Sequence, residues 1–115
     1  MSSKHAAHKH TIGKLYSNIL KNNRIRSPKT PKQLERHLKG VSNHRRIEIL
    51  LLVAKRDGIS VDEISTTLNC NFKTISSHTH RLVQAGLLEK KYFGQNVLHS
   101  LSPYGKQIHL FLQSF

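Results

Sequence analysis

The stretch from Ser60 to Leu88 constrains the fold of this chain more than any other part of the sequence. Ser60 is a good helix N-cap, and Glu63 follows it at the spacing of a capping box. Asn71 can cap a second helix, and Gly86 suits the left-handed position that closes one. Core-facing residues recur at helical spacing, at Val61, Ile64 and Leu68 and then at Ile75, Thr79 and Leu82. The pattern predicts a helix-turn-helix, whose second helix can lie in a DNA major groove.

Two further helices are predicted before this motif. The first, at about residues 31–39, carries Thr30 as N-cap, Pro31 at N1, Gln33 at N3 and Gly40 as its end. The second is expected at about residues 43–56, with Ser42 as its cap. It is apolar nearly all round from Ile47 to Ala54, which predicts the central buried helix of the domain.

After Gly86 the pattern changes to strands. Runs at 87–93 and 97–101, separated by a loop at 94–96 that contains glycine, predict a β-hairpin. Ser102 and Pro103 should begin a last helix, whose apolar stripe is Tyr104, Ile108, Phe111, Leu112 and Phe115. The predicted fold class is α+β, mostly helical: a winged helix-turn-helix over residues 30–115, in which the hairpin is the wing.

The remaining residues, 1–29, are predicted to form a basic N-terminal extension with one amphipathic helix at about 11–22. The whole chain has 19 Lys and Arg against 6 Asp and Glu, a net charge of +13. Most of this excess precedes residue 41. Such a charge favours a polyanionic partner, most commonly nucleic acid, although ribosome-associated and membrane-surface proteins can share it.

Cys70 is the single cysteine among the 115 residues. It excludes an intramolecular disulfide and a thiolate cluster for a metal, and it favours a reducing, cytoplasmic location, here expected at the nucleoid. We interpret it as a structural residue in the turn, with a redox-sensitive thiol as the alternative. No segment resembles a signal peptide, and the longest apolar run is too short to span a bilayer.

The polar face of the second motif helix contains the candidate DNA-binding residues, which can all donate hydrogen bonds and include no acid. They are Lys73, Thr74, Ser76, Ser77, His80 and Arg81, with Gln84 beyond them. The wing adds Lys90, Lys91, Gln95 and Asn96, and His99 as a further candidate. Such side chains read base edges or contact phosphates. The alternative is an ordinary solvated helix face. His78 is expected to be half-buried and packed or hydrogen-bonded in the core.

The chain resembles the ArsR-type winged-helix repressors from about Leu38 to Leu101. The match rests on Ser42, Arg46, Ile47, Ile49 and Leu50, and then on Glu63-Ile64, Leu68, Thr74-Ile75-Ser76, His78, Leu82 and Ala85-Gly86-Leu87. This resemblance implies a homodimer joined through the helices around 31–39 and 104–115. The apolar stripe of the last helix agrees with a dimer. A last helix that only closes the core of its own monomer is the alternative.

Departures from the family pattern remove its metal sites. Ser60 and Asp62 stand where the arsenic-type sensor has Cys-x-Cys, and the last helix has only His109 where the zinc-type site uses several Asp and His residues. Thr79 and Arg81 stand where the family usually has Leu and an apolar residue, so Arg81 is an added phosphate contact or a solvated side chain. A cluster of His5, His8 and His10 could bind a divalent cation, but without a preorganised fold. We therefore predict no metal site and no cofactor.

These features together predict a sequence-specific double-stranded DNA-binding transcriptional regulator that acts as a homodimer. No phosphate-binding loop, nucleophile elbow or carboxylate pair suggests an enzyme. Two other functions fit the charge or the N-terminal helix. One is an architectural, chromatin-type protein with little sequence preference, and the other is a protein-interaction module. Arg24, Arg26 and the N-terminal lysines would add non-specific attraction to DNA in either DNA-binding case.

Overall fold

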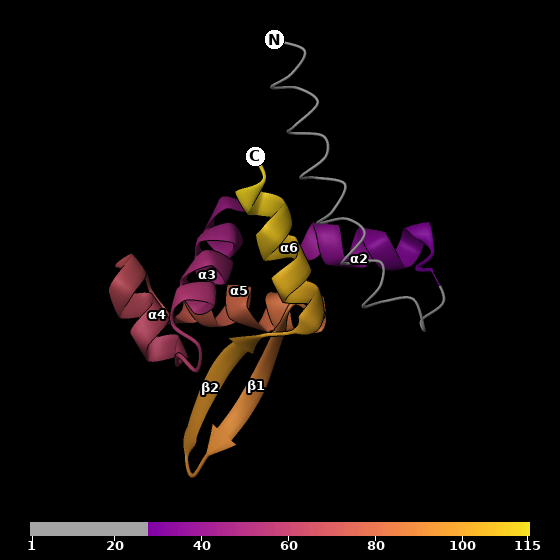
Figure 1. Cartoon of the computed structure of the whole chain (residues 1–115). Coiled ribbons are helices and arrows are strands. Elements are labelled where there is room, and N and C mark those ends of the chain that lie inside the picture. Colours follow the sequence, from indigo (N-terminus) through magenta and orange to yellow (C-terminus); the bar gives the residue numbers. More distant parts are fainter. Residues whose placement is uncertain (1–27) are drawn as a thin grey trace, which may run out of the picture.

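The computed structural model describes residues 28–115, which form five helices and one two-stranded antiparallel sheet (Figure 1). The helices are α2 (Pro31–Val41), α3 (His44–Lys55), α4 (Val61–Leu68), α5 (Phe72–Gln84) and α6 (Pro103–Gln113), and the strands are β1 (Leu88–Phe93) and β2 (Asn96–Leu101). The order and the antiparallel hairpin confirm the predicted winged helix-turn-helix. The amphipathic helix predicted at about 11–22 lies outside the described residues.

Helix α3 lies at the centre of the fold, as predicted from its apolar sequence. Ile49, Leu50 and Val53 are buried almost completely, and α3 packs against α2, α4, α5, α6 and β2. The core continues into Ile64 of α4 and Leu82 of α5. Burial of such side chains stabilises the fold by roughly 1.5–3 kcal/mol each, so this cluster fixes the position of α5.

The predicted start of four helices is confirmed. Thr30 and Gln33 form a reciprocal capping box, and Ser60, Asn71 and Ser102 each accept a backbone N–H at the start of the following helix. Only part of the box at Ser60 forms among the described residues, because the Glu63 carboxylate lies 3.4 Å from Arg56 Nη2 instead of returning to the cap.

The junction between α2 and α3 differs from the prediction in two ways. Gly40 does not end α2, which continues through Val41, and Ser42 is the C-terminal cap of α2. Asn43, and not Ser42, caps α3, because its side-chain oxygen accepts from the backbone N–H groups of Arg45 and Arg46. The side-chain oxygen of an N-cap residue reaches the free N–H groups two and three residues after it. Asn43 has this spacing to Arg45 and Arg46, whereas Ser42 is one residue too early.

Gly40 is needed inside α2 for packing. A β-carbon at this position would overlap the Cβ of Ala85, which follows α5. The missing side chain therefore allows α2 to cross closely over the C-terminal end of α5. Glycine at an interior helix position costs about 1 kcal/mol of helix propensity relative to alanine, and this close approach explains its presence.

The wing extends away from the helices at the lower end of the molecule in Figure 1. Its register pairs Leu88 with Leu101 and Phe93 with Asn96, so the loop is the two residues Gly94-Gln95 and not the three predicted. Gly94 has φ +60°, as the first residue of a II′ turn requires. A β-bridge between Ile59 and His99 ties the base of the wing to the loop before α4.

The apolar stripe predicted on α6 divides into two parts. Tyr104, Ile108 and Leu112 pack against the core, whereas Phe111 and Phe115 are exposed. Leu34 and Leu38 of α2 are exposed as well. Among the described residues, no helix has the length and apolarity needed to cross a membrane.

Candidate nucleic-acid interface

Helix α5 presents two chemically distinct faces. Ile75, Thr79 and Leu82 are at most 1% exposed and point into the core. Thr79 is satisfied there because its hydroxyl donates to the carbonyl oxygen of Ile75 at 2.7 Å. This local bond explains how a threonine can occupy a core position where the resembled family usually has leucine.

The opposite face of α5 carries the predicted site residues and is open to solvent. Lys73, Thr74, Ser77, His80, Arg81 and Gln84 are exposed, and Ser76 is half-buried. Asn71 fixes the start of this helix by accepting from Lys73 N–H at 2.8 Å and Thr74 N–H at 3.4 Å. The structure thus brings all six predicted helix residues onto one element, with Ser76 at the edge of the open face.

His78 lies between the two faces and is half-buried, as predicted. Its Nδ1 is 3.1 Å from Nη1 of Arg46, a buried arginine of α3. Burial, and then the charges of Arg46 and Arg81, lower the pKa of His78. A neutral ring whose Nδ1 accepts the Arg46 hydrogen bond satisfies this geometry. His78 therefore couples α5 to α3 and is not part of the exposed face.

Four of the five wing candidates are available to a ligand. Lys90, Lys91, Gln95 and Asn96 are exposed. Because side chains alternate along a strand, Lys90 and Lys91 point to opposite faces of the hairpin. Sequence reasoning did not single out Tyr92 and Phe93, which are also exposed at the end of the wing.

The fifth wing candidate, His99, is not available, and its inclusion was wrong. It is 2% exposed, and its ring Nδ1 lies 3.3 Å from the carbonyl oxygen of Ile59. Burial is the main cause that lowers its pKa, the hydrogen bond to Ile59 opposes this, and Lys90 adds to the lowering. The bridge to Ile59, distant in sequence, turns His99 inward at the base of the wing.

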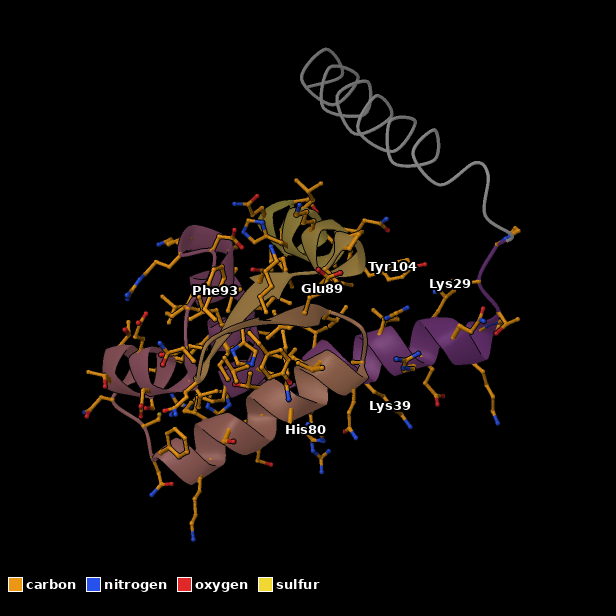
Figure 2. All side chains as sticks on the ribbon, turned by 90° about the horizontal axis from the view of Figure 1, so that it is seen from below. Lys29, Lys39, His80, Glu89, Phe93 and Tyr104 are labelled. Carbon is orange, nitrogen blue, oxygen red and sulfur yellow. The ribbon has the colours of Figure 1, made fainter. Side chains whose placement is uncertain are left out.

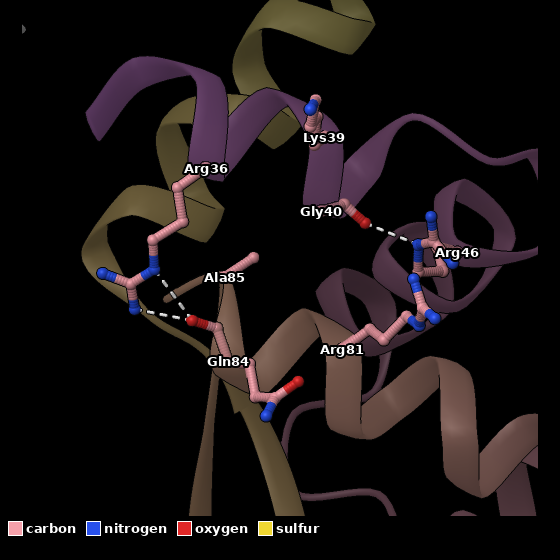
Figure 3. Close-up of a pocket in the computed structure, with 7 residues that line it drawn as sticks. All are labelled: Arg36, Lys39, Gly40, Arg46, Arg81, Gln84 and Ala85. Atoms are coloured by element: carbon pink, nitrogen blue, oxygen red, sulfur yellow. Dashed lines mark hydrogen bonds between the residues drawn. The ribbon is translucent and has the colours of Figure 1, made fainter. Parts of the chain in front are cut away.

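Positive charge extends from α5 toward α2. Figure 2 shows Lys39 of α2 and His80 of α5 projecting from the same side of the molecule, opposite α6. Beside them, Arg36, Arg46 and Arg81 line a pocket between α2, α3 and α5 (Figure 3). Of these cations, the sequence pattern singled out Arg81 as a candidate contact. Arg36 and Arg46 lie far from α5 in the chain, so no local spacing signalled them.

The described part of the chain contains no group of three His, Cys, Asp or Glu side chains that could hold a metal ion. His5, His8 and His10 lie outside it. Cys70 is half-buried against the core, with its Sγ 3.4 Å from the carbonyl oxygen of Leu68. This position agrees with the structural role proposed for Cys70.

Comparison with known proteins identifies the fold. No family model and no curated protein sequence matches the chain. Among solved structures, reduced HlyU from Vibrio cholerae is 27% identical, with a TM-score of 0.62 over 70% of this chain and 84% of that one. HlyU from Vibrio vulnificus, a transcriptional regulator, is 26% identical, with a TM-score of 0.62 over 83% and 95% of the two chains.

A third similar structure, from Mycobacterium bovis, is a fragment of a possible ArsR-family transcriptional regulator, described as a homodimeric winged helix-turn-helix DNA-binding domain. It is 26% identical, with a TM-score of 0.65 over 71% of this chain and 76% of that one. These similarities confirm the predicted winged-helix fold and the predicted resemblance to ArsR-type regulators.

Proposed function

From this ArsR-like winged-helix architecture, we propose that the chain is a sequence-specific double-stranded DNA-binding transcriptional regulator and not an enzyme. The observation that carries the proposal is the open face of α5, where Lys73, Ser77, His80 and Arg81 lie exposed with no acid among them. Hydroxyl, imidazole and cationic donors on a helix that fits a major groove can contact both base edges and phosphates.

The proposed interface has a centre and a flank. Lys73, Thr74, Ser76, Ser77, His80 and Arg81 would face the major groove and its bordering phosphates. Lys90, Lys91, Gln95 and Asn96 would reach the adjacent minor groove or backbone from the wing. Contacts to phosphates position the protein, and contacts to base edges from α5 select the sequence.

We propose further that the chain acts as a homodimer through α2 and α6. Leu34 and Leu38 are 47% and 51% exposed on α2, and Phe111 is 51% exposed on α6. Leaving these side chains in water is unfavourable, and a second copy would cover them. The similar Mycobacterium bovis domain is described as homodimeric. Two-fold symmetry would place two α5 helices about 34 Å apart, facing successive major grooves.

The organisation proposed for the whole chain is a winged-helix DNA-binding domain at residues 30–115 preceded by a basic extension at 1–29. Because the basic excess of the sequence is concentrated before residue 41, the extension would strengthen DNA binding without selecting a sequence. This function belongs with a cytoplasmic, nucleoid-associated protein that needs no metal or cofactor.

The proposed function is tested by selecting bound duplexes from a random pool and then measuring affinity for selected and random duplexes across salt. A specific regulator should prefer the selected duplex by at least roughly 10³-fold. The double variant Ser77→Ala/His80→Ala should lose most of this preference while retaining its binding to random DNA.

A matched control removes one hydroxyl and one imidazole elsewhere. Thr66→Ala/His109→Ala changes α4 and α6. With sedimentation showing the same assembly state as the wild type, it should leave the preference intact. Equal affinity for selected and random duplexes, falling steeply with salt and unchanged in Ser77→Ala/His80→Ala, would favour the architectural alternative instead.

A further inference from the structure

A pocket of about 360 Å³ lies where α2 crosses the C-terminal end of α5 (Figure 3). Four cationic side chains line it, from three different helices: Arg36 and Lys39 of α2, Arg46 of α3 and Arg81 of α5. None of the residues that line it is acidic. The pocket therefore concentrates positive charge with no acid in its lining.

Two of the arginines are held in place by backbone carbonyls at helix ends. Arg36 donates from Nε and Nη2 to the Gln84 carbonyl oxygen at 2.9 and 2.6 Å. Arg46 donates from Nε to the Gly40 carbonyl oxygen at 2.6 Å, and its Nη1 meets His78. Each guanidinium keeps a further amino group, Nη1 of Arg36 and Nη2 of Arg46, with no hydrogen bond to another described residue. The pocket thus offers preoriented donors.

The other two cations are less constrained. Arg81 is exposed, its side chain makes no ion pair or hydrogen bond within residues 28–115, and in Figure 3 that side chain extends toward Arg46. Lys39 lies 3.5 Å from Glu35 in an exposed pair, whose contribution is small and screened by solvent. Both side chains can turn toward a ligand at little cost.

Arg81 lies close enough to Arg46 to disfavour the charge of Arg46. Burial, and then the charge of Arg81, lower the pKa of Arg46. A guanidinium remains protonated under these conditions, so the repulsion persists in the free protein. An anion bound between Arg46 and Arg81 would remove it, and the pocket is large enough for one.

Phosphate is the anion that this arrangement fits best. A guanidinium presents parallel N–H donors that match two oxygens of a phosphate, and several such groups can share its three or four oxygens. The pocket also continues the open face of α5, because Arg81 and Gln84 follow Ser77 at the i+4 and i+7 positions. A DNA strand lying along that face would carry phosphates past the pocket.

We propose that the pocket formed by Arg36, Lys39, Arg46 and Arg81 is a phosphate-binding site that takes a backbone phosphate of the DNA beyond the C-terminal end of α5. The source of the phosphate rests on the proposed function. The site would add anchoring contacts from α2 and α3 to those of α5 and the wing. Because these contacts reach only the backbone, they contribute equally on every sequence.

The first experiment measures the dependence of DNA affinity on salt for the full chain. Lys39→Gln and Arg81→Gln are suitable because neither side chain holds a helix end. Each should reduce the slope of log K against log salt by about 1, on selected and random duplexes alike. Lys106→Gln removes the same charge from an exposed side chain of α6, a helix that lies on the opposite side of the molecule from Lys39 in Figure 2, and should leave the slope unchanged. Slopes of Lys39→Gln equal to those of Lys106→Gln would overturn the proposal.

The second experiment locates the phosphate. Single methylphosphonates, which remove one backbone charge, are placed in turn along the selected duplex. At the position that occupies the pocket, the wild-type chain should lose affinity, while Lys39→Gln/Arg81→Gln should lose much less on the same duplex. Equal losses for both proteins at every position would contradict a DNA phosphate in this pocket.

A third measurement separates this proposal from the proposed function. Inorganic phosphate is titrated into the chain at constant ionic strength, and the arginine Nε–Hε signals are followed by NMR. Saturable shifts of the Arg36 and Arg81 signals support a phosphate site, and the Arg36 shift should be lost in Lys39→Gln/Arg81→Gln. If these shifts appeared but no duplex bound, the proposed DNA-binding function would be wrong. The phosphate site would stand, and its ligand would be a free phosphoester. The absence of such shifts, together with unchanged salt slopes in the Lys39→Gln and Arg81→Gln variants, would overturn the proposed phosphate site.

Discussion

Gly40 of α2 faces Ala85 at the end of α5 so closely that a β-carbon at Gly40 would overlap the Cβ of Ala85. The contact joins two helices with different proposed tasks, since α2 carries exposed leucines and α5 carries the candidate DNA-binding face. The carbonyl oxygens of the same two segments, at Gly40 and Gln84, hold Arg46 and Arg36. One close crossing thus sets how α2 lies against the end of α5 and shapes the basic pocket.

Gly40→Ala should therefore destabilise the protein. Overpacking costs about 1–3 kcal/mol, whereas the gain in helix propensity is about 1 kcal/mol. The obstructing atom belongs to a short side chain on a helix end and cannot rotate away, so the overpacking cost should lie near the upper end of this range. We therefore expect a net loss of about 2 kcal/mol in the free energy of unfolding. Urea denaturation followed by circular dichroism measures it.

Restoring space provides the control for this prediction. Ala85→Gly in the Gly40→Ala background removes the overlapping methyl group and should recover part of the lost stability. A double variant that is less stable than the sum of the two single changes would show that the overlap is not the cause.

The unfolding free energy should fall as the pH drops below the ordinary histidine pKa. His78 and His99 both have a lowered pKa in the folded chain, mainly because of burial. The unfolded chain therefore takes up protons near pH 6.5 while the folded chain does not, and the slope of stability against pH is positive there. The contribution of the two neutral histidines to the free energy of unfolding is fully present above this pH. It decreases as the pH falls toward their pKa values in the folded chain.

The contribution of each histidine can be isolated with asparagine, which does not titrate. His99→Asn keeps an amide that can donate to the Ile59 carbonyl oxygen. Between pH 7.5 and pH 5.5 it should lose less stability than the wild-type chain, and His78→Asn should also lose less. Parallel pH profiles for the variants and the wild type, measured by urea denaturation, would exclude these two residues as the cause.

Lys90 and Lys91 should contribute unequally to DNA binding. Their register partners are His99 and Leu98, and as neighbours in β1 they occupy opposite faces of the wing. With α5 in the major groove, one face of the wing is turned toward the duplex. Replacing the lysine on that face by Gln should reduce the salt slope by about 1, and replacing the lysine on the opposite face, which reaches the backbone only past the edge of the wing, should reduce it less. Equal reductions from both, measured by fluorescence anisotropy, would contradict this orientation.

Phe111→Glu should convert the proposed dimer into a monomer, because it places a charge in the apolar contact between α6 helices. Phe93→Glu introduces the same change at another exposed phenylalanine, the last residue of β1. Figure 1 shows that this end of the wing lies far from α2 and α6. It should leave the dimer intact. Sedimentation equilibrium at micromolar concentration distinguishes the two. A monomeric wild-type chain under these conditions would contradict the dimer directly.

Signals confined to a few neighbouring residues predicted the fold well. Asn71 and the pair Ser102-Pro103 begin their helices as expected, because a cap depends only on backbone groups two or three residues away. The hairpin and the buried helix α3 follow equally local patterns. These features sufficed for the winged helix and for the face of α5 that carries the candidate site.

Features that depend on distant parts of the chain were missed. Gly40 was expected to end a helix, but its contact with Ala85 keeps it inside one. His99 was expected on the surface, but the bridge to Ile59 buries it. The Glu63 carboxylate was expected to complete the capping box at Ser60, but it pairs with Arg56 instead. The basic pocket escaped detection for the same reason, since its cations come from three separate helices.

The crossing of α2 over α5 has a consequence for how a dimer would measure DNA. Helix α2 carries the leucines that would join two copies, and it is in direct contact with the end of α5, which would read bases, at Gly40 and Ala85. Neither reading helix can then swivel independently to follow a displaced half-site. One inserted base pair rotates a half-site by about 34–36°. The proposed dimer should therefore bind only one spacing between half-sites. It should bind weakly to an operator with one base pair inserted between the half-sites, even when every contacted base is retained.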